Sequence, residues 1–129
     1  MWPMLTPDDL RYSPDHEWIR IEGNRARLGI TDYAQDALGD VVFIDLPEVG
    51  AAVTGGQVIS EVESTKSVSE IYSPLAGEII EVNTDLVDAP DRLNTDPYGE
   101  GWICVIELGS TVDLTELLDA TAYTQLTEA

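Results

Sequence analysis

The chain contains one cysteine and one histidine among its 129 residues, and this scarcity excludes several kinds of site. Cys104 has no partner for an internal disulfide, which suits a reducing compartment. A zinc site normally needs three or four closely spaced Cys, His or carboxylate ligands, and one histidine plus one cysteine does not supply them. Because Cys104 falls in an alternating apolar run, we expect a buried and inert thiol.

Basic residues are also scarce: six face 25 acidic ones, which gives a formal net charge of −19. Nucleic acids and anionic membranes both require a basic surface, so we expect neither as a partner. No apolar run approaches the roughly 18 residues of a membrane span. The first residues show neither a basic signal region nor an arginine-rich presequence. We therefore expect a cytoplasmic protein. A monomer is expected as well, although none of these observations bears on the oligomeric state.

The motifs of common catalytic and nucleotide-binding sites are missing as well. The sequence has no G-x-G-x-x-G, no P-loop motif and no G-x-S-x-G. Four aspartates between residues 84 and 101 do not follow the D-x-[DN]-x-[DN]-G pattern of a calcium loop, so we interpret this stretch as a solvated loop with one helical turn. The acidic residues are scattered, and no carboxylate pair stands out for acid–base catalysis. No catalytic or metal-binding residue is predicted.

What the sequence does contain is a series of short alternating runs. A hydrophobic content of 43% and a length typical of one domain predict a single folded unit over 1–129, with residues 1–9 as a loose lead. Gly23-Asn24 predicts a tight hairpin between the first two strands. The pattern as a whole predicts a small β-sandwich or barrel with helices at its margins. The expected strands are 18–22, 25–30, 41–46, 57–63, 67–72, 78–83 and 102–108.

Two helices are expected beside these strands. The first spans 32–38, with Asp32 and Gln35 arranged as a capping box and Gly39 as the stop. The second closes the chain, with Asp113 as its cap and Glu116 at the third helical position. Its core-facing residues would be Leu114, Leu117 and Leu118.

The only lysine, Lys66, follows Glu63-Ser64-Thr65 between two predicted strands that leave room for no more than a tight turn. Its side chain is therefore expected to project from the tip of a hairpin. One interpretation is an ordinary surface lysine. The other is an acylation site, because an exposed amine on a long flexible stem can carry a group that swings between places. The residues alone lead to the hypothesis of a carrier domain.

The run from Val62 to Glu78, V-E-S-T-K-S-V-S-E-I-Y-S-P-L-A-G-E, resembles the lipoyl-lysine segment of the glycine cleavage system H protein family. Roughly residues 10 to 125 follow the family pattern. Gly50, sixteen residues before Lys66, and Gly77, eleven after it, fit the glycine spacing of lipoyl domains. The further matching stretches, in order, are His16-Glu17-Trp18, 29–34, 38–40, 94–102 and 117–123.

This resemblance implies a mainly β, barrel-sandwich hybrid fold: two small antiparallel sheets with short peripheral helices and a C-terminal helix. It implies that Lys66 carries lipoic acid, and that this arm shuttles the aminomethyl group of glycine. The group would pass from a pyridoxal-phosphate glycine decarboxylase to a tetrahydrofolate-dependent aminomethyltransferase, and a dihydrolipoamide dehydrogenase would reoxidise the arm. The chain itself would be a non-catalytic carrier.

The resemblance also gives roles to three acidic residues. Glu63 matches an acid that lipoylating enzymes recognise. Glu17 matches a glutamate that lines the cleft where the loaded arm rests, and Glu70 lies where the family places an acid near the arm. For Glu17 and Glu70 the alternative is a solvated acidic surface. Two departures from the family pattern are Ser67, where alanine is common, and the absence of any lysine besides Lys66.

Other functions stay open at this stage. A lipoyl domain of a 2-oxoacid dehydrogenase complex would lack the His16-Glu17-Trp18 opening and the terminal helix, and would continue into a linker. A biotinyl domain would show methionines beside the lysine, where this chain has Thr65 and Ser67. An H-like protein that relays lipoate without a glycine cleavage role is not separable by sequence. A hydrolase is disfavoured because the chain lacks a usable triad or metal-ligand set.

Overall fold

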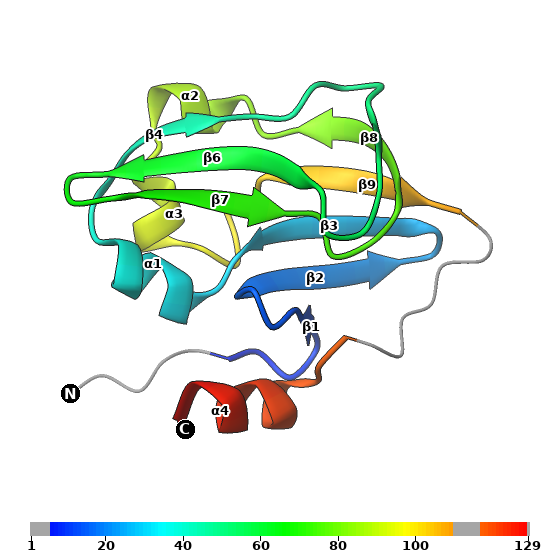
Figure 1. Cartoon of the computed structure of the whole chain (residues 1–129), viewed down its shortest axis with the longest axis horizontal. Helices are drawn as coiled ribbons and strands as arrows, with labels where there is room; N and C mark the ends of the chain where they lie inside the picture. The colour runs from blue at the N-terminus through cyan, green and yellow to red at the C-terminus, as the bar shows by residue number, and fades with distance from the viewer. Residues whose placement is uncertain (1–5, 110–116, 129) are drawn as a thin grey trace.

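A computed structural model describes residues 6–109 and 117–128 of the chain (Figure 1). Its strands form two antiparallel sheets, one of six strands in the order β1-β2-β3-β9-β8-β5 and one of three in the order β4-β6-β7. The strands are β1 (Arg11–Tyr12), β2 (Glu17–Glu22), β3 (Arg25–Ile30), β4 (Val41–Asp45), β5 (Ala52–Val53), β6 (Val58–Ser64), β7 (Val68–Tyr72), β8 (Gly77–Val82) and β9 (Cys104–Leu108). The helices are α1 (Asp32–Leu38), α2 (Asp85–Asp88), α3 (Arg92–Thr95) and α4 (Ala120–Glu128).

The main core lies between the two sheets, because alternate residues of each strand point inward. In β3, Ala26, Leu28 and Ile30 are buried, whereas Arg25 and Arg27 face solvent. This arrangement confirms the predicted mainly β fold of two antiparallel sheets with short helices, and within the described residues neither sheet closes into a barrel. Cys104 is fully buried in this core, and burial raises the pKa of its thiol to about 12, as expected for an inert cysteine.

A smaller apolar cluster lies on the outer side of the six-stranded sheet, where α4 packs against β1 and β2 (Figure 1). The rings of Tyr12 and Tyr123 stack there at 4.7 Å. Trp18 is fully buried, and its indole Nε1 donates a hydrogen bond to the Pro97 carbonyl at 2.8 Å. The late loop and the terminal helix are therefore both anchored on this face of the sheet.

Gly29 leaves the room that the Trp18 ring occupies. A Cβ at position 29 would lie 2.5 Å from Trp18 Cε2, and the buried, hydrogen-bonded indole has nowhere to move. We expect Gly29→Ala to lower the free energy of unfolding by about 2 kcal/mol through overpacking, measured by urea denaturation. Gly109→Ala is the matched control, since nothing lies within 4 Å of its added Cβ. Equal stabilities for the two variants would contradict this packing argument.

Helix α1 and its stop at Gly39, whose φ is 83°, confirm the prediction for residues 32–38. The predicted cap was wrong by one position. Thr31 is the N-cap, because its Oγ1 accepts a hydrogen bond from the Ala34 amide at 3.1 Å. Asp32 is instead the first helical residue, and its Oδ1 accepts from the Gln35 side chain at 2.8 Å.

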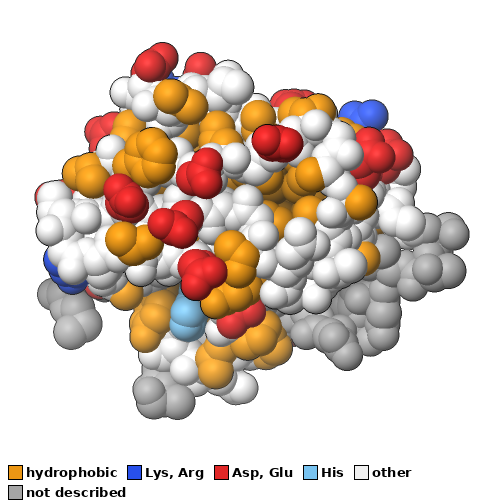
Figure 2. All heavy atoms as spheres, turned by 45° about the horizontal axis from the view of Figure 1, so that its top comes forward, with side chains coloured by type: hydrophobic (Ala, Val, Ile, Leu, Met, Phe, Trp, Pro, Cys, Tyr) orange, Lys and Arg blue, Asp and Glu red, His pale blue; other side chains and the backbone are white. Residues whose placement is uncertain are grey.

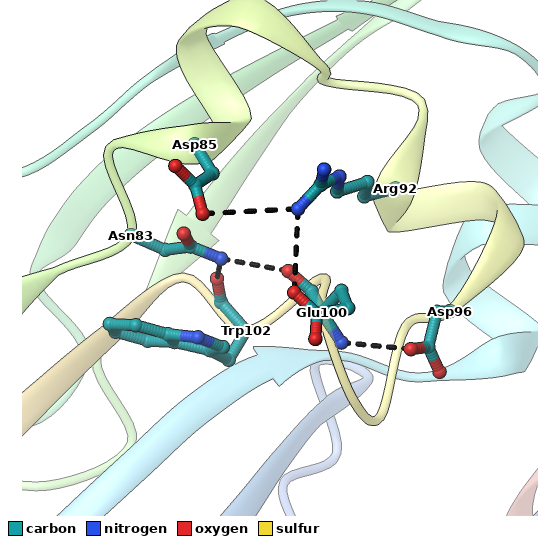
Figure 3. Close-up of polar contacts among 6 residues, drawn as sticks. All are labelled: Asn83, Asp85, Arg92, Asp96, Glu100 and Trp102. Carbon is teal, nitrogen blue, oxygen red and sulfur yellow. Dashed lines mark hydrogen bonds and ion pairs between the residues drawn. The ribbon is translucent and has the colours of Figure 1, made fainter.

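The stretch from 84 to 101 contains two short helices, α2 and α3, where one helical turn was expected. Figure 3 shows how its charged side chains hold it together. Arg92 Nη1 lies 3.8 Å from Asp85 Oδ2 and 3.3 Å from Glu100 Oε2, and the Glu100 amide donates to Asp96 Oδ2 at 2.9 Å. Asn83 Nδ2 donates to the carbonyl oxygens of Glu100 and Trp102. The contacts of Asp85, Asp96 and Glu100 thus stabilise this segment.

The terminal helix begins later than predicted. Asp113, Leu114 and Glu116 lie outside the described residues, and Leu118 pairs with Tyr12 in an isolated antiparallel bridge rather than in a helix. Helix α4 starts at Ala120, with Asp119 as its cap: Asp119 Oδ1 accepts from the Ala122 amide at 2.8 Å. Leu117 and Leu118 do pack against the buried clusters, as expected.

Two further segments complete the description. Strands β1 and β5 have two residues each, too few for an alternating pattern to indicate them. Residues 1–9 were expected to form a loose lead, and residues 1–5 of it lie outside the described residues. The rest makes contacts with the fold. The Pro7 carbonyl accepts a hydrogen bond from the Tyr12 hydroxyl, and Asp9 forms an ion pair with Arg20 at 3.1 Å. No helix in the described ranges is long and apolar enough to cross a membrane.

Candidate functional site

Lys66 lies at the tip of the hairpin formed by β6 and β7. The two strands pair antiparallel from Val58 opposite Tyr72 to Glu63 opposite Val68, and the chain turns through residues 65–67. The side chain of Lys66 is exposed. In Figure 1 this turn lies at the edge of the molecule, close to α1. The structure therefore places the only lysine of the chain where the sequence predicted it.

Hydrogen bonds fix the backbone of this tip. The Ser64 amide donates to the Ser67 carbonyl at 2.8 Å, and Ser64 Oγ accepts from the amides of Lys66 and Ser67 at 3.2 and 3.0 Å. The Thr65 amide donates to the Asp40 carbonyl at 3.0 Å, which ties the tip to the loop after α1. The turn is thus held from both sides, and none of the described ion pairs involves the Lys66 ammonium.

Gly39 lies directly beneath the stem of Lys66. A Cβ at position 39 would lie 3.1 Å from Lys66 Cε, so the aliphatic stem runs close over this glycine. The φ of 83° at Gly39 is one that other residues rarely adopt. The stop of α1 therefore serves a second purpose, since it leaves space for the side chain at the hairpin tip.

A groove of about 240 Å³ opens beside the tip, between α1, strand β7 and the segment at residues 15–16. Ser67, next to Lys66 in the chain, lines one end of it. Ala34 and Leu38 contribute apolar surface from α1. A side chain anchored at the tip can therefore lie along the groove, with its apolar part against the helix.

His16 and Tyr33 form an aromatic part of this groove, with ring centroids 4.7 Å apart. His16 Nδ1 lies 2.7 Å from the Tyr123 hydroxyl, which also bonds Thr31 Oγ1 at 2.8 Å, so α4 holds the imidazole in place. His16 has a left-handed φ of 71°, a strained conformation for a side chain of this size. Burial lowers the pKa of His16 below its usual value, against an opposing effect of Asp15.

Two acidic residues, Asp15 and Glu70, are also among the residues that line the groove, and no Lys or Arg is among its described lining residues. Asp15 precedes His16, whereas Glu70 comes from β7, three residues beyond Ser67. Opposite charges attract more strongly where part of the solvent is excluded. The groove is therefore suited to a ligand with an apolar chain and a cationic end.

Glu17 lies close to this groove but does not line it. Its side chain is 1% exposed; Oε1 accepts from Ser13 Oγ at 2.7 Å and Oε2 accepts from the Tyr72 amide at 3.0 Å. Burial raises the pKa of Glu17 to about 7, although both hydrogen bonds favour the charged form. The carboxylate connects the start of β2 to the end of β7, and so joins the two sheets.

Of the four residues singled out from the sequence, Lys66, Glu63 and Glu70 belong to one hairpin. Glu63 is half-buried on β6, opposite Val68. Sequence reasoning missed Asp15, Tyr33 and the contribution of Tyr123. Helical spacing in the sequence places Tyr33, Ala34, Ala37 and Leu38 on one side of α1, and in the structure all four line the groove.

Two antiparallel sheets with an exposed lysine at the tip of a hairpin define a lipoyl-domain-like protein. Comparison with known proteins narrows this class. A model of the glycine cleavage H-protein family matches residues 10–129. The chain therefore belongs to the glycine cleavage H-protein family.

Individual relatives agree with this assignment. The glycine cleavage system H protein of Symbiobacterium thermophilum is 52% identical over 122 residues, which is 95% of this chain and 95% of that protein. Its counterpart in Mycobacterium tuberculosis is 54% identical over 124 residues, or 91% and 92% of the two chains. A crystal structure of a glycine cleavage system H protein from Mycobacterium marinum has a TM-score of 0.87 and 46% identity, and covers 95% of this chain and 99% of that one.

Proposed function

We propose that this protein is the lipoyl carrier of a glycine cleavage system, with lipoic acid attached to Nζ of Lys66. The observation that supports this most directly is an exposed, unique lysine at a fixed hairpin tip beside an open groove. When bound, lipoate supplies a disulfide that accepts the aminomethyl group of glycine. The partners would be glycine decarboxylase, aminomethyltransferase, dihydrolipoamide dehydrogenase and the lipoylating enzymes. Because the named relatives are bacterial proteins, we propose that the carrier meets these enzymes in the cytoplasm.

The residues around the tip fit such a group. The apolar surface of Ala34 and Leu38 suits an aliphatic chain, and the carboxylates of Asp15 and Glu70 suit a cationic amine at its end. An arm lying in this groove would be shielded from water, which protects a labile cargo during transfer between enzymes. The tethered arm would also reach a high effective concentration wherever the carrier docks.

Glu63 and Glu17 have different positions relative to the tip. Glu63 lies three residues before Lys66 on the same hairpin, where a lipoylating enzyme that acts on the lysine would meet it, and we propose it as a recognition residue. A direct contact of Glu17 with the arm stays a prediction. The hydrogen bonds of Glu17 support a positioning role, in which it holds β7, one wall of the groove, against the start of β2.

We also propose that the chain carries out no chemical step itself. Its own thiol, Cys104, is fully buried with a raised pKa, so it does not exchange with the thiols of the arm. Lys66 anchors the arm, the groove shelters it, and the enzymes that dock on the carrier supply the catalytic groups.

The test is an intact-mass measurement on protein made together with a lipoylating system, followed by a glycine–bicarbonate exchange assay with glycine decarboxylase. We expect one lipoyl adduct per chain and exchange that depends on it. A lipoylated chain that supports no exchange would indicate a lipoate relay instead. A chain that gains no adduct would contradict the carrier function altogether.

A further inference from the structure

The outer face of the three-stranded sheet has an unusual pattern of side chains. Because paired residues in adjacent strands share a face, the register gives three rows across β4, β6 and β7. We call this the outer hairpin face. Its rows are Phe43-Glu63-Val68, then Asp45-Glu61-Glu70, then Val58-Tyr72.

The first and third rows expose apolar side chains to solvent. Phe43, Val68 and Val58 have exposed fractions of 51%, 58% and 42%. The pairing of β4 with β6 is irregular between Val41 and Phe43, and both Val42 and Phe43 are exposed. Figure 2, which turns the top of Figure 1 toward the viewer, shows hydrophobic and acidic side chains interleaved on this part of the surface. Clustered apolar side chains rimmed by charge are typical of interaction sites.

The middle row places three carboxylates side by side. Asp45 lies opposite Glu61, and Glu61 lies opposite Glu70, with no described ion pair to any of them. Like charges directly opposite each other destabilise a sheet. A cationic surface placed over the row would remove this repulsion, so the row favours a basic partner over a neutral one.

Three of the five arginines gather on a different face of the molecule. Arg20, Arg25 and Arg27 line a hollow on the outer face of the six-stranded sheet, where Glu22 and Glu81 accompany them. The charge of the molecule is thus unevenly distributed: the outer hairpin face is acidic, and the face with the arginines is mixed. A basic partner is attracted to the face that adjoins Lys66 and oriented on it.

We infer that the outer hairpin face is the surface on which glycine decarboxylase docks, through a basic patch over Asp45, Glu61 and Glu70 and an apolar recess for Phe43 and Val68. This inference rests on the proposed function. It is supported by the acidic row, which a basic patch would complement, and by continuity, because Val68 and Glu70 also line the groove beside the tip. A partner docked there would lie next to Lys66 and next to the open side of the groove.

The test compares two double variants with the same change of net charge, both made as lipoylated protein. Asp45→Asn/Glu61→Gln alters the outer hairpin face, and Glu22→Gln/Glu81→Gln alters the mixed face. We expect the first to weaken the affinity for glycine decarboxylase about fivefold at low salt, with a reduced salt dependence, and the second to leave both unchanged. Phe43→Ala should weaken affinity about tenfold at any salt concentration.

Three outcomes would overturn the inference. If both double variants weaken the affinity for glycine decarboxylase equally, total charge and not this face steers the partner. The other two are that neither double variant weakens this affinity, or that only the affinity for the lipoylating enzyme falls. Thermal denaturation of each variant shows whether the fold is retained, and the Glu22/Glu81 variant controls for general effects of lost charge. Failure of the proposed function is distinguishable, because the unaltered chain would then gain no lipoyl adduct or support no exchange.

Discussion

Lys66→Arg is expected to abolish both lipoylation and exchange activity. The guanidinium keeps the positive charge and most of the stem, but it has no amine that forms the lipoyl amide. Because the Lys66 side chain is exposed, the free energy of unfolding should change by less than about 0.5 kcal/mol. Intact mass measures the adduct, and the exchange assay should fall to the level seen without the carrier.

Ser67→Ala is the matched control for this experiment, because it alters the adjacent tip residue and leaves the amine in place. The Ser67 amide and carbonyl make the hydrogen bonds to Ser64, so the turn should survive the loss of the hydroxyl. We expect full lipoylation of this variant. A lipoyl adduct on the Lys66→Arg chain would place the modification at another amine and remove the basis of the proposed function.

Glu17 should make stability depend on pH in a direction opposite to that of a salt-bridged acid. Its pKa is raised from about 4.5 to about 7 in the folded protein, so the folded state binds the proton more tightly than the unfolded state. The stabilisation is fully present below about pH 4.5 and is lost as the pH rises through about 7. From the size of this shift the loss is roughly 3 kcal/mol.

Glu17→Gln isolates this contribution, because an amide does not titrate and can still accept from the Tyr72 amide while donating to Ser13 Oγ. Between pH 5 and pH 8, we expect the unaltered protein to lose stability relative to this variant in urea denaturation. Glu48→Gln, which removes an exposed carboxylate, should run parallel to the unaltered protein. Parallel curves for Glu17→Gln as well would refute the raised pKa.

The sequence predicted the parts of the fold that depend on local pattern. The β2–β3 hairpin follows from alternation on both sides of Gly23, whose φ is 61°, and the β6–β7 hairpin follows from two alternating runs with no room for a loop. The position of Lys66 was therefore predictable. The proposal that Lys66 carries lipoate did not follow from the residues alone, because an exposed amine has the same chemistry on any hairpin; it came from the family resemblance.

The errors arose where distant contacts decide the structure. Leu114, Leu117 and Leu118 have helical spacing, yet Leu118 pairs with Tyr12, and no local pattern indicates that bridge. The groove was invisible for the same reason: the His16 ring is held by Tyr123, which is 107 positions away in the chain. Glu17 looked like a cleft-lining acid by resemblance, and only the packing of β2 against β7 shows that it is buried.

The hydrogen bonds that Ser64 Oγ and the Asp40 carbonyl accept from the turn have a consequence for how far the proposed arm would reach. A flexible loop would add its own length to the distance that a group attached to Lys66 could reach. This turn is instead held by hydrogen bonds to neighbouring residues. If the proposed arm is attached to Lys66, the radius of delivery would be set by the covalent bonds beyond the Lys66 Cα. Each enzyme of the proposed system would then have to bring its reacting centre inside that fixed radius, so the depth of its active-site channel should match the length of one side chain with its attached group.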